Sequence, residues 1–274
     1  MGTNLKGNSL AIAVMVLVAA VLEGCAALES RHGAYDIRQA QIEVAHRSLP
    51  ITLIIPKVSP RRKVLVLYAT GDNGWRGTNR LLFTHMAERG YRIAACDPNV
   101  VLSQIKRAEG RVTLVAAAAA VDRVLMQAKR ELGLPDATPT IFTGFSRGSN
   151  LVVFAAGEPD LQRHLLGAIA VALTREADHL REPDSARRTP ALQIDDKGRL
   201  QTYPAIKRLG ALRFAVIQSS GDSYVRAEES RRLFGPDTPT RRLYAVAAED
   251  HAFNGGHEAL LRDLDDALAW IIAH

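Results

Sequence analysis

Short apolar runs alternate with longer amphipathic stretches through most of the chain. The short runs are rich in Val, Ile and Leu, as buried strands are, and the longer stretches have the apolar spacing of helices. The predicted strands are residues 41–46, 51–55, 64–68, 91–96, 140–143, 166–173, 212–218 and 242–247. The predicted helices are residues 79–89, 111–132, 150–156, 227–234 and 260–272. This alternation predicts an α/β fold with a mostly parallel central sheet flanked by helices.

Two segments depart from the alternation. Residues 41–46 and 51–55 have no helix between them, so we expect an antiparallel pair of strands that turns near Pro50. Residues 174–210 are highly charged and contain several prolines. A segment of this length without an apolar period is usually functional or disordered. It is therefore either a small cap over a functional site or a solvated insertion, and the sequence leaves both alternatives open.

The first 25 residues have the pattern of an export signal. The apolar run at residues 10–22 is short for a transmembrane helix and suits a signal peptide. It ends in L-E-G-C, which resembles a bacterial lipobox, so Cys25 is the predicted lipidation site. A signal peptide cut near residue 26 and an uncleaved anchor are the alternatives. Each of the three predicts a periplasmic or cell-envelope protein, and lipidation would hold it at the membrane.

Composition limits the remaining chain to a few classes. Residues 26–38 are polar and predict a tether, which leaves 39–274 as one α/β domain. The net charge of +6 is scattered, without a basic stripe interleaved with aromatic residues, so no nucleic-acid partner is expected. Two cysteines, Cys25 and Cys96, are too few for a disulfide framework. No metal-binding motif or phosphate-binding loop is present, so neither a metal nor a cofactor is expected.

The run from Pro139 to Gly157 carries the most specific motif. Gly144, Ser146 and Gly148 form G-x-S-x-G between a predicted strand and a predicted helix. This context is typical of a nucleophile elbow, in which a strained turn projects the serine hydroxyl above the sheet. The backbone N–H of Arg147 would then point toward a developing oxyanion. The alternative is a glycine-rich turn whose serine caps the helix.

The loop after the predicted strand 64–68 reads T-G-D-N-G-W-R-G over residues 70–77. In a hydrolase of this kind the loop at this place supplies the second oxyanion N–H, which we assign to Asp72 or Asn73. Asp72 and Trp75 are also expected to contact the substrate. A carboxylate beside an oxyanion opposes catalysis unless it points away or binds a cation. The alternative is a plain strand-to-helix turn capped by Asp72.

Two further residues complete a catalytic pattern. Asp222 follows the predicted strand 212–218, and His251 follows the last predicted strand. The carboxyl ends of parallel strands share one edge of a sheet, so Ser146, Asp222 and His251 are expected to meet there. Their order along the chain is that of the α/β-hydrolase triad. His257 is expected at the surface, and Asp250 is next to His251 in the chain, where side chains rarely face each other.

The two motifs together carry a family resemblance. "TGDNGWRG" at residues 70–77 and "GFSRGSNLVVF" at residues 144–154 are similar to the VirJ/AcvB group of bacterial virulence proteins, within the α/β-hydrolase superfamily. Asn73 stands where that group has a glycine, and "DHAFNGGH" is more like a general esterase. The resemblance implies export to the periplasm and hydrolysis of aminoacyl-phospholipids such as lysyl-phosphatidylglycerol.

The sequence thus predicts a serine hydrolase that cleaves small-molecule or lipid carboxylic esters through an acyl-enzyme, with no cofactor. Two other classes stay open. The first is a non-catalytic periplasmic binding or assembly protein on a hydrolase scaffold. The second is a peptidase or an acyltransferase with the same triad, because the acceptor is chosen by the shape of the pocket.

Overall fold

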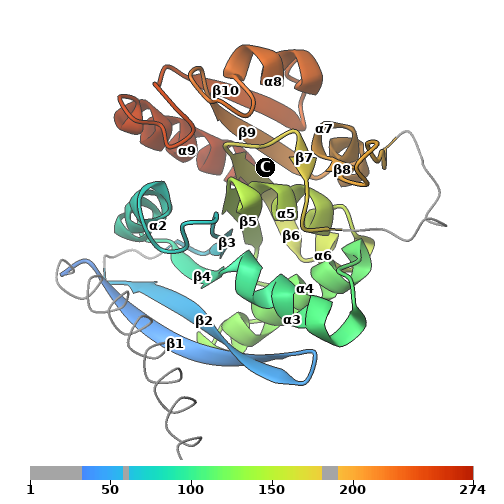
Figure 1. Ribbon diagram of the computed structural model, residues 1–274. Coiled ribbons are helices and arrows are strands. Elements are labelled where there is room, and N and C mark those ends of the chain that lie inside the picture. The colour runs from blue at the N-terminus through green and yellow to red at the C-terminus, as the bar shows by residue number, and fades with distance from the viewer. Residues whose placement is uncertain (1–32, 58–61, 181–190, 274) are drawn as a thin grey trace, which may run out of the picture.

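The computed structural model describes residues 33–57, 62–180 and 191–273. Its centre is an eight-stranded sheet in the order β1-β2-β4-β3-β5-β6-β9-β10 (Figure 1). The strands are β1 Tyr35–Val44, β2 Arg47–Pro56, β3 Leu65–Ala69, β4 Arg92–Cys96, β5 Thr140–Phe145, β6 Leu165–Val171, β9 Arg213–Ser219 and β10 Arg241–Val246. From β4 to β10 every neighbouring pair is parallel, and only β1 and β2 run antiparallel to their neighbours.

Helices cover both faces of the sheet (Figure 1). They are α2 Thr78–Glu88, α3 Pro98–Glu109, α4 Leu114–Glu131, α5 Arg147–Ala156, α6 Pro159–Gln162, α8 Ala227–Phe234 and α9 His257–Ile272. Alternate residues of a strand point to opposite faces. Leu65 and Leu67 accordingly pack with α3, α4 and α5, whereas Val66 and Tyr68 pack with α2 and α9. These two apolar clusters fix the sheet between its helical layers and confirm the predicted α/β architecture.

The first hairpin differs from the prediction. The turn lies at Ala45 and His46, and Pro50 is inside β2, opposite Gln41 of β1. Proline is tolerated there because β4 pairs with β2 only from Thr52 onward, so no ladder on that side needs its missing N–H. Strand β1 begins at Tyr35, so the predicted tether at 26–38 extends too far. The tether up to residue 32, the export signal and Cys25 lie outside the described residues.

Helix α3 was not predicted, nor were the single turns α6 and α7 (Thr202–Ala205), and α4 begins later than expected. Helix α3 has Asp97 as its N-cap, whose carboxylate accepts from the Asn99 N–H, and Pro98 occupies the first turn. The helix predicted at 111–132 is α4, which begins at Leu114 with Thr113 as its N-cap. Only a few residues of α3 are buried, which explains why its apolar period is weak in the sequence.

The charged segment at 174–210 is packed against the domain where it is described. It contains β7 Glu176–Ala177, β8 Leu200–Gln201, α7 Thr202–Ala205 and the 3₁₀ turn η1 Ile206–Leu209. Strands β7 and β8 form a small antiparallel sheet. Leu180, Leu200, Tyr203 and Leu209 are buried in the same cluster as α4 and α5. The described part of the segment is therefore a packed insertion. Within the described ranges, no helix is both long and apolar enough to cross a membrane.

Candidate active site

Ser146 lies on a strained turn between β5 and α5. Its backbone angles, φ 54° and ψ −117°, cost a non-glycine residue about 1–3 kcal/mol. A Cβ at Gly144 would collide with the carbonyl oxygen of Gly148, and a Cβ at Gly148 would collide with that of Ala69. The two glycines of the motif thus let the strand and the helix approach closely around the serine.

Ser146, His251 and Asp222 form a continuous chain of hydrogen bonds. Ser146 Oγ lies 2.8 Å from His251 Nε2, and His251 Nδ1 lies 2.7 Å from Asp222 Oδ2. The three side chains follow β5, β10 and β9, so all of them stand at the carboxyl edge of the parallel strands. The structure therefore brings together the three residues that the sequence singled out. In this arrangement Asp222 accepts the Nδ1 proton, and Nε2 is free to accept the proton of Ser146.

The Asp222 carboxylate is buried and held from several sides. Gln218 Nε2 donates to Oδ2 at 2.9 Å, and the Tyr224 N–H donates to Oδ1 at 2.8 Å. Gln218 also donates to the Val225 carbonyl oxygen and accepts from the Leu173 N–H. The sequence analysis missed Gln218. Its signal was a polar residue directly after the apolar run of strand β9, four residues before the aspartate.

Aromatic rings contact the histidine on two sides. The Tyr224 ring meets the His251 ring edge to face, with centroids 4.8 Å apart, and the Phe145 ring lies at 5.5 Å. Tyr224 is 65% exposed, although its ring contacts His251 and its backbone N–H binds the buried Asp222 carboxylate. It thus offers a substrate an aromatic surface next to Ser146. Sequence analysis missed Tyr224, because one aromatic residue in a loop gives no periodic signal.

The loop after β3 lies directly against the serine turn. A Cβ at Gly71 would come within 3.1 Å of the Phe145 carbonyl oxygen and 3.2 Å of Ser146 Cβ. The Gly74 N–H donates to the Gly71 carbonyl oxygen at 3.0 Å and closes a tight turn over Asp72 and Asn73. The bond that closes such a turn joins its first and last residues, so the N–H groups of the two central residues are not used within the turn. Of the two central residues, Asp72 directly follows Gly71, the residue that packs on Ser146.

Asn79 anchors this loop from the buried side. Its Oδ1 accepts from the Gly71 N–H at 3.0 Å and from the Tyr68 hydroxyl at 2.9 Å. The Arg147 N–H opens α5, where the first N–H groups of a helix have no partner within the helix. The predicted donors Arg147 and Asp72 therefore both come from backbone segments beside Ser146, and Asn79 fixes one of those segments.

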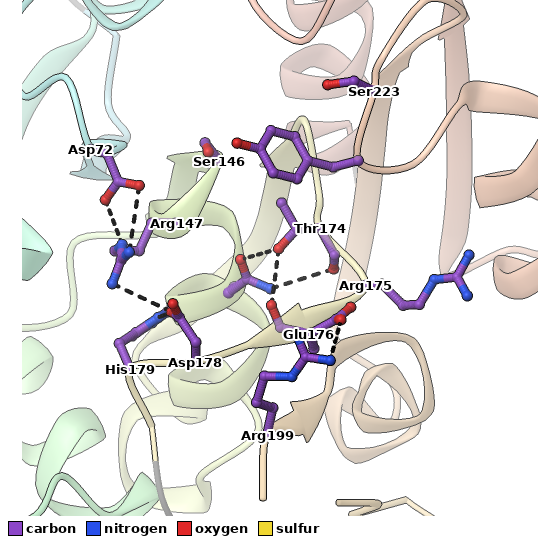
Figure 2. Close-up of a pocket in the computed structure, with 12 residues that line it drawn as sticks. Asp72, Ser146, Arg147, Thr174, Arg175, Glu176, Asp178, His179, Arg199 and Ser223 are labelled. Carbon is purple, nitrogen blue, oxygen red and sulfur yellow. Dashed lines mark hydrogen bonds and ion pairs between the residues drawn. The ribbon is translucent and has the colours of Figure 1, made fainter. Parts of the chain in front are cut away.

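The Asp72 side chain is paired with a cation. Arg147 Nε lies 2.5 Å from Asp72 Oδ1, and the other side of the same guanidinium reaches Asp178 Oδ1 at 3.5 Å (Figure 2). A carboxylate beside an oxyanion opposes catalysis unless it points away from the oxyanion or binds a cation. The structure supplies that cation from the residue that follows the serine, so Arg147 offsets the charge of Asp72.

Trp75 lies apart from the serine cavity. Its ring packs edge to face on Phe83 of α2, with centroids 5.6 Å apart, and joins the apolar cluster on that face. Trp75 is not one of the described residues that line the cavity at Ser146. The lining of this cavity therefore gives no support to the predicted contact between Trp75 and substrate. A tryptophan in a glycine-rich loop suits a binding site equally well in sequence, but here its ring is partly buried against the neighbouring helix.

Ser146 opens into a cavity of about 520 Å³ with strongly polar walls. The insertion supplies half of the lining, namely Thr174, Arg175, Glu176, Asp178, His179 and Arg199 (Figure 2). The charges are paired: Arg199 contacts Glu176 at 2.9 Å, and Arg175 pairs with Glu229 outside the cavity. This packed wall supports the cap alternative over the solvated insertion. Walls of this kind suit a substrate that forms hydrogen bonds, because they offer little apolar surface to a long acyl chain.

Two adjacent residues of the wall have shifted pKa values. The hydrogen bond from His179, followed by the charge of Arg147, holds the pKa of Asp178 well below its usual range. Burial lowers the pKa of His179, whose side chain is only 9% exposed. Asp178 is therefore ionised and His179 neutral near pH 7.

The remaining candidates have structural roles. His257 is exposed at the start of α9, and the Asp250 carboxylate accepts from the backbone N–H groups of Ala252 and Asn254. Cys96 is buried, and burial raises the pKa of its thiol to about 12, so it is not a reactive nucleophile. No cluster of His, Cys, Asp and Glu suited to a metal occurs among the described residues.

Solved structures resemble the whole domain. Est1E from Butyrivibrio proteoclasticus superposes with a TM-score of 0.58 at 16% identity, over 86% of this chain and 99% of that one. An esterase from an Arctic intertidal metagenomic library gives 0.55 at 15% identity, over 87% and 96%. XC6422 from Xanthomonas campestris, a serine hydrolase without a lid, gives 0.58 at 12% identity, over 87% and 95%.

The protein has the α/β-hydrolase fold. At these identities the likeness establishes the architecture alone. No protein-family model matches the chain, and no curated protein matches it either. The similarity to the VirJ/AcvB group therefore stays a prediction from the two motifs.

Proposed function

We propose that this α/β-hydrolase-fold protein is a serine hydrolase that cleaves carboxylic esters through an acyl-enzyme. The observation that carries the proposal is the hydrogen-bonded chain from Ser146 Oγ through His251 to Asp222, at 2.8 and 2.7 Å. A serine hydroxyl is a weak nucleophile at neutral pH and needs an adjacent base that a third group orients. The esterases among the structures with the same fold support this choice of reaction.

The reaction starts with attack by Ser146 Oγ on the ester carbonyl carbon, while His251 Nε2 takes the hydroxyl proton. Asp222 stabilises the imidazolium that forms and stays ionised. Collapse of the tetrahedral intermediate breaks the bond to the alcohol oxygen, which receives the proton from His251. Water then gives its proton to His251 and attacks the acyl carbon. The second collapse releases the carboxylic acid and returns the proton to Ser146 Oγ.

Both tetrahedral intermediates carry a negative charge on the former carbonyl oxygen. We assign its two donors to the backbone N–H of Arg147, at the start of α5, and to that of Asp72, in the turn that packs on Ser146. Such donors contribute most when they are fixed in advance. The hydrogen bond from Gly71 to Asn79 supplies that rigidity on the loop side.

For the substrate, we propose a polar ester, and aminoacyl-phospholipids such as lysyl-phosphatidylglycerol are the specific candidates. Three carboxylates line the cavity, those of Asp72, Glu176 and Asp178, and a cationic aminoacyl group would share them with the arginines that already pair with them. The motif resemblance points the same way. A matched pair of lysyl and norleucyl esters tests the class, because the two acyl groups differ mainly in the terminal ammonium group. Faster cleavage of the lysyl ester is expected, and equal rates would remove the aminoacyl proposal.

We also propose that the protein is exported and anchored through a lipid on Cys25, from the apolar run and the lipobox-like residues that precede it. The test is metabolic labelling with a radioactive fatty acid, comparing the natural chain with Cys25→Ser. Label on the natural chain alone supports the proposal. Equal label on both, or none on either, contradicts it.

The decisive experiment for the enzyme is the intact mass of the full-length protein after treatment with a fluorophosphonate. One adduct is expected on the natural protein and none on Ser146→Ala. The control is Ser223→Ala, which removes another exposed hydroxyl from the same cavity and should still be labelled. A folded natural protein that forms no adduct would contradict an activated serine and favour a binding role on this scaffold.

A further inference from the structure

A second cavity of about 330 Å³ adjoins the serine cavity. The two cavities share one wall, formed by Arg147, Asp178 and His179. Across that wall, the second cavity is bounded by α3 and by the loop that connects α3 to α4. A substrate whose ester lies at Ser146 therefore has a second cavity within reach, on the far side of Arg147.

The second cavity is the more cationic of the two. Its charged lining residues are Lys106, Arg111, Arg147 and Asp178, so three positive groups face one carboxylate. Asp178 is already held by Arg147 and by His179. Neither Lys106 nor Arg111 has an ion-pair partner within the described residues. The serine cavity differs, because each of its arginines is paired with an acidic residue.

Polar groups surround these two cations. Ser103 and Asn99 of α3 line the same cavity; the Ser103 hydroxyl already donates to the Val100 carbonyl oxygen, whereas the Asn99 amide, which reaches Asp72 at 3.4 Å with one N–H, keeps a second N–H to donate. His179 lies in the shared wall and is nearly buried, and its Nδ1 donates to Asp178, so in the neutral ring Nε2 is an acceptor, without a partner in the described part of the chain, and does not itself attract an anion. The attraction for an anion therefore comes from the positive charges of Lys106 and Arg111, with the Asn99 amide as a further donor. An anion with several acceptor oxygens has the complementary chemistry.

We propose that this cavity is a subsite for an anionic group, of the phosphate type, carried by the ester substrate. The proposal rests on the proposed ester hydrolysis and narrows its substrate class to esters with an anion some distance from the scissile bond. Lys106 and Arg111 supply the attraction, and Arg147 separates the anion from Ser146. The same chemistry fits a phospholipid headgroup and a soluble phosphate ester.

Binding is tested first, without reference to catalysis. Isothermal titration of the full-length protein with inorganic phosphate is compared among the natural chain, Lys106→Gln/Arg111→Gln and Arg107→Gln. Arg107 is a matched control, since it is an exposed cation on the same helix that does not line the cavity. Phosphate should bind to the natural chain and to the control, and binding should weaken about tenfold or more in the double variant. Equal binding in all three, or none in any, overturns the proposal.

Substrate preference is tested second, with 1-acetylglycerol and 1-acetylglycerol 3-phosphate, which share one ester bond. The natural chain should cleave the phosphorylated ester with a kcat/KM about fivefold or more above the neutral one, and the double variant should have a ratio near one. An unchanged ratio in the double variant overturns the proposal. If neither ester is cleaved but phosphate binds through Lys106 and Arg111, the proposed function fails and the anion site stands.

A third arm separates the two sources of the anion. Sedimentation with phosphatidylglycerol vesicles is compared with sedimentation with neutral phosphatidylcholine vesicles, in competition with free phosphate. Recruitment that depends on Lys106 and Arg111 and that phosphate reverses identifies a lipid headgroup. Phosphate binding without such recruitment identifies a soluble phosphate ester. Both results support the subsite, whereas recruitment that the double variant retains assigns vesicle binding to another surface and contradicts a headgroup in this cavity.

Discussion

Gln218 Nε2 donates to Asp222 Oδ2 at 2.9 Å, and this is the same oxygen that accepts from His251. One carboxylate oxygen is thus fixed by a neutral side chain from within the sheet while it orients the histidine. The other two bonds of Gln218 tie it to the Leu173 N–H and to the Val225 carbonyl oxygen. Gln218 is therefore a positioning residue for the proposed triad, because it acts through Asp222.

Replacement of Gln218 by leucine should reduce both stability and turnover. Leucine has a similar volume but leaves the Leu173 N–H and the Val225 carbonyl oxygen without that partner inside the protein. We expect the free energy of unfolding to fall by about 2–4 kcal/mol, since each buried unpaired group costs about 1–3 kcal/mol. We expect kcat to fall about tenfold as Asp222 loses a donor. Urea denaturation and ester hydrolysis measure the two effects.

The variant Gln218→Glu separates positioning from simple loss of stability. Glutamate keeps an acceptor for Leu173 but places a second carboxylate beside Asp222, and two like charges cannot both ionise freely. The acidic limb of the kcat/KM profile should therefore move to higher pH. A limb in the same place as in the natural protein would show that Gln218 does not act on the triad.

The sheet and the three aligned side chains were predictable because each has a local signal. Strand β3 is a run of apolar residues. Ser146 lies between two glycines, which the close contact of strand and helix at this turn requires. Asp222 and His251 follow their strands directly. The parallel sheet, itself predictable, then brings residues far apart in sequence to one edge.

The surroundings of the site were not predictable, because they depend on tertiary contacts. Asn79 faces inward from α2 and holds a loop through a single oxygen, and nothing in its neighbours marks that role. Tyr224 and Arg147 act through partners from distant segments. Trp75 shows the opposite case: its loop suggested a binding role, but its ring packs on Phe83 of α2.

His179 should make stability depend on pH. Burial lowers its pKa, and the neighbouring charges are those of Asp178, Arg147 and Asp72. Below the ordinary histidine value of about 6.5, the unfolded chain binds a proton that the folded chain does not, so stability falls as pH falls. The loss between about pH 7 and about pH 5 should be smaller in His179→Asn, which keeps a donor for Asp178.

The measurement is the urea midpoint at each pH, with His257→Asn as the control because His257 is exposed. The lowered pKa of Asp178 acts in the same direction but at lower pH, below about 4, so it does not enter this window. If His179→Asn and the natural chain lose equal stability, the histidine is not buried in its neutral form.

The turn of the first hairpin should be open to stabilisation. Ala45 and His46 both have positive φ, 48° and 60°, in a two-residue connection that Asn-Gly adopts with less strain. We expect Ala45→Asn/His46→Gly to raise the free energy of unfolding by about 1 kcal/mol, since a left-handed conformation costs an ordinary residue about that much. Thermal unfolding measures it. Ala45→Val, which is β-branched, should lower the melting temperature, and the reverse order of the two variants would refute the turn geometry.

The pair of Arg147 and Asp72 makes the sharpest prediction about the proposed oxyanion site. The Asp72 backbone is one of the assigned donors, so its carboxylate stands near the developing negative charge, and Arg147 Nε offsets it from 2.5 Å. In Arg147→Gln the backbone donor remains but the carboxylate is left unpaired. We expect kcat/KM for a neutral ester to fall about 10- to 100-fold, because a charge at this range contributes a few kcal/mol at an effective dielectric constant near 20.

Removal of the carboxylate in the same background should then restore activity. Asp72→Asn alone is expected to change kcat/KM by about threefold or less, and Arg147→Gln/Asp72→Asn should recover most of the loss, which gives a strongly non-additive cycle. A neutral ester is used so that charge on the substrate does not enter the comparison. Additive losses in the double variant would mean that Arg147 supports the site through position, and the charge of Asp72 would then have no part in stabilising or opposing the oxyanion.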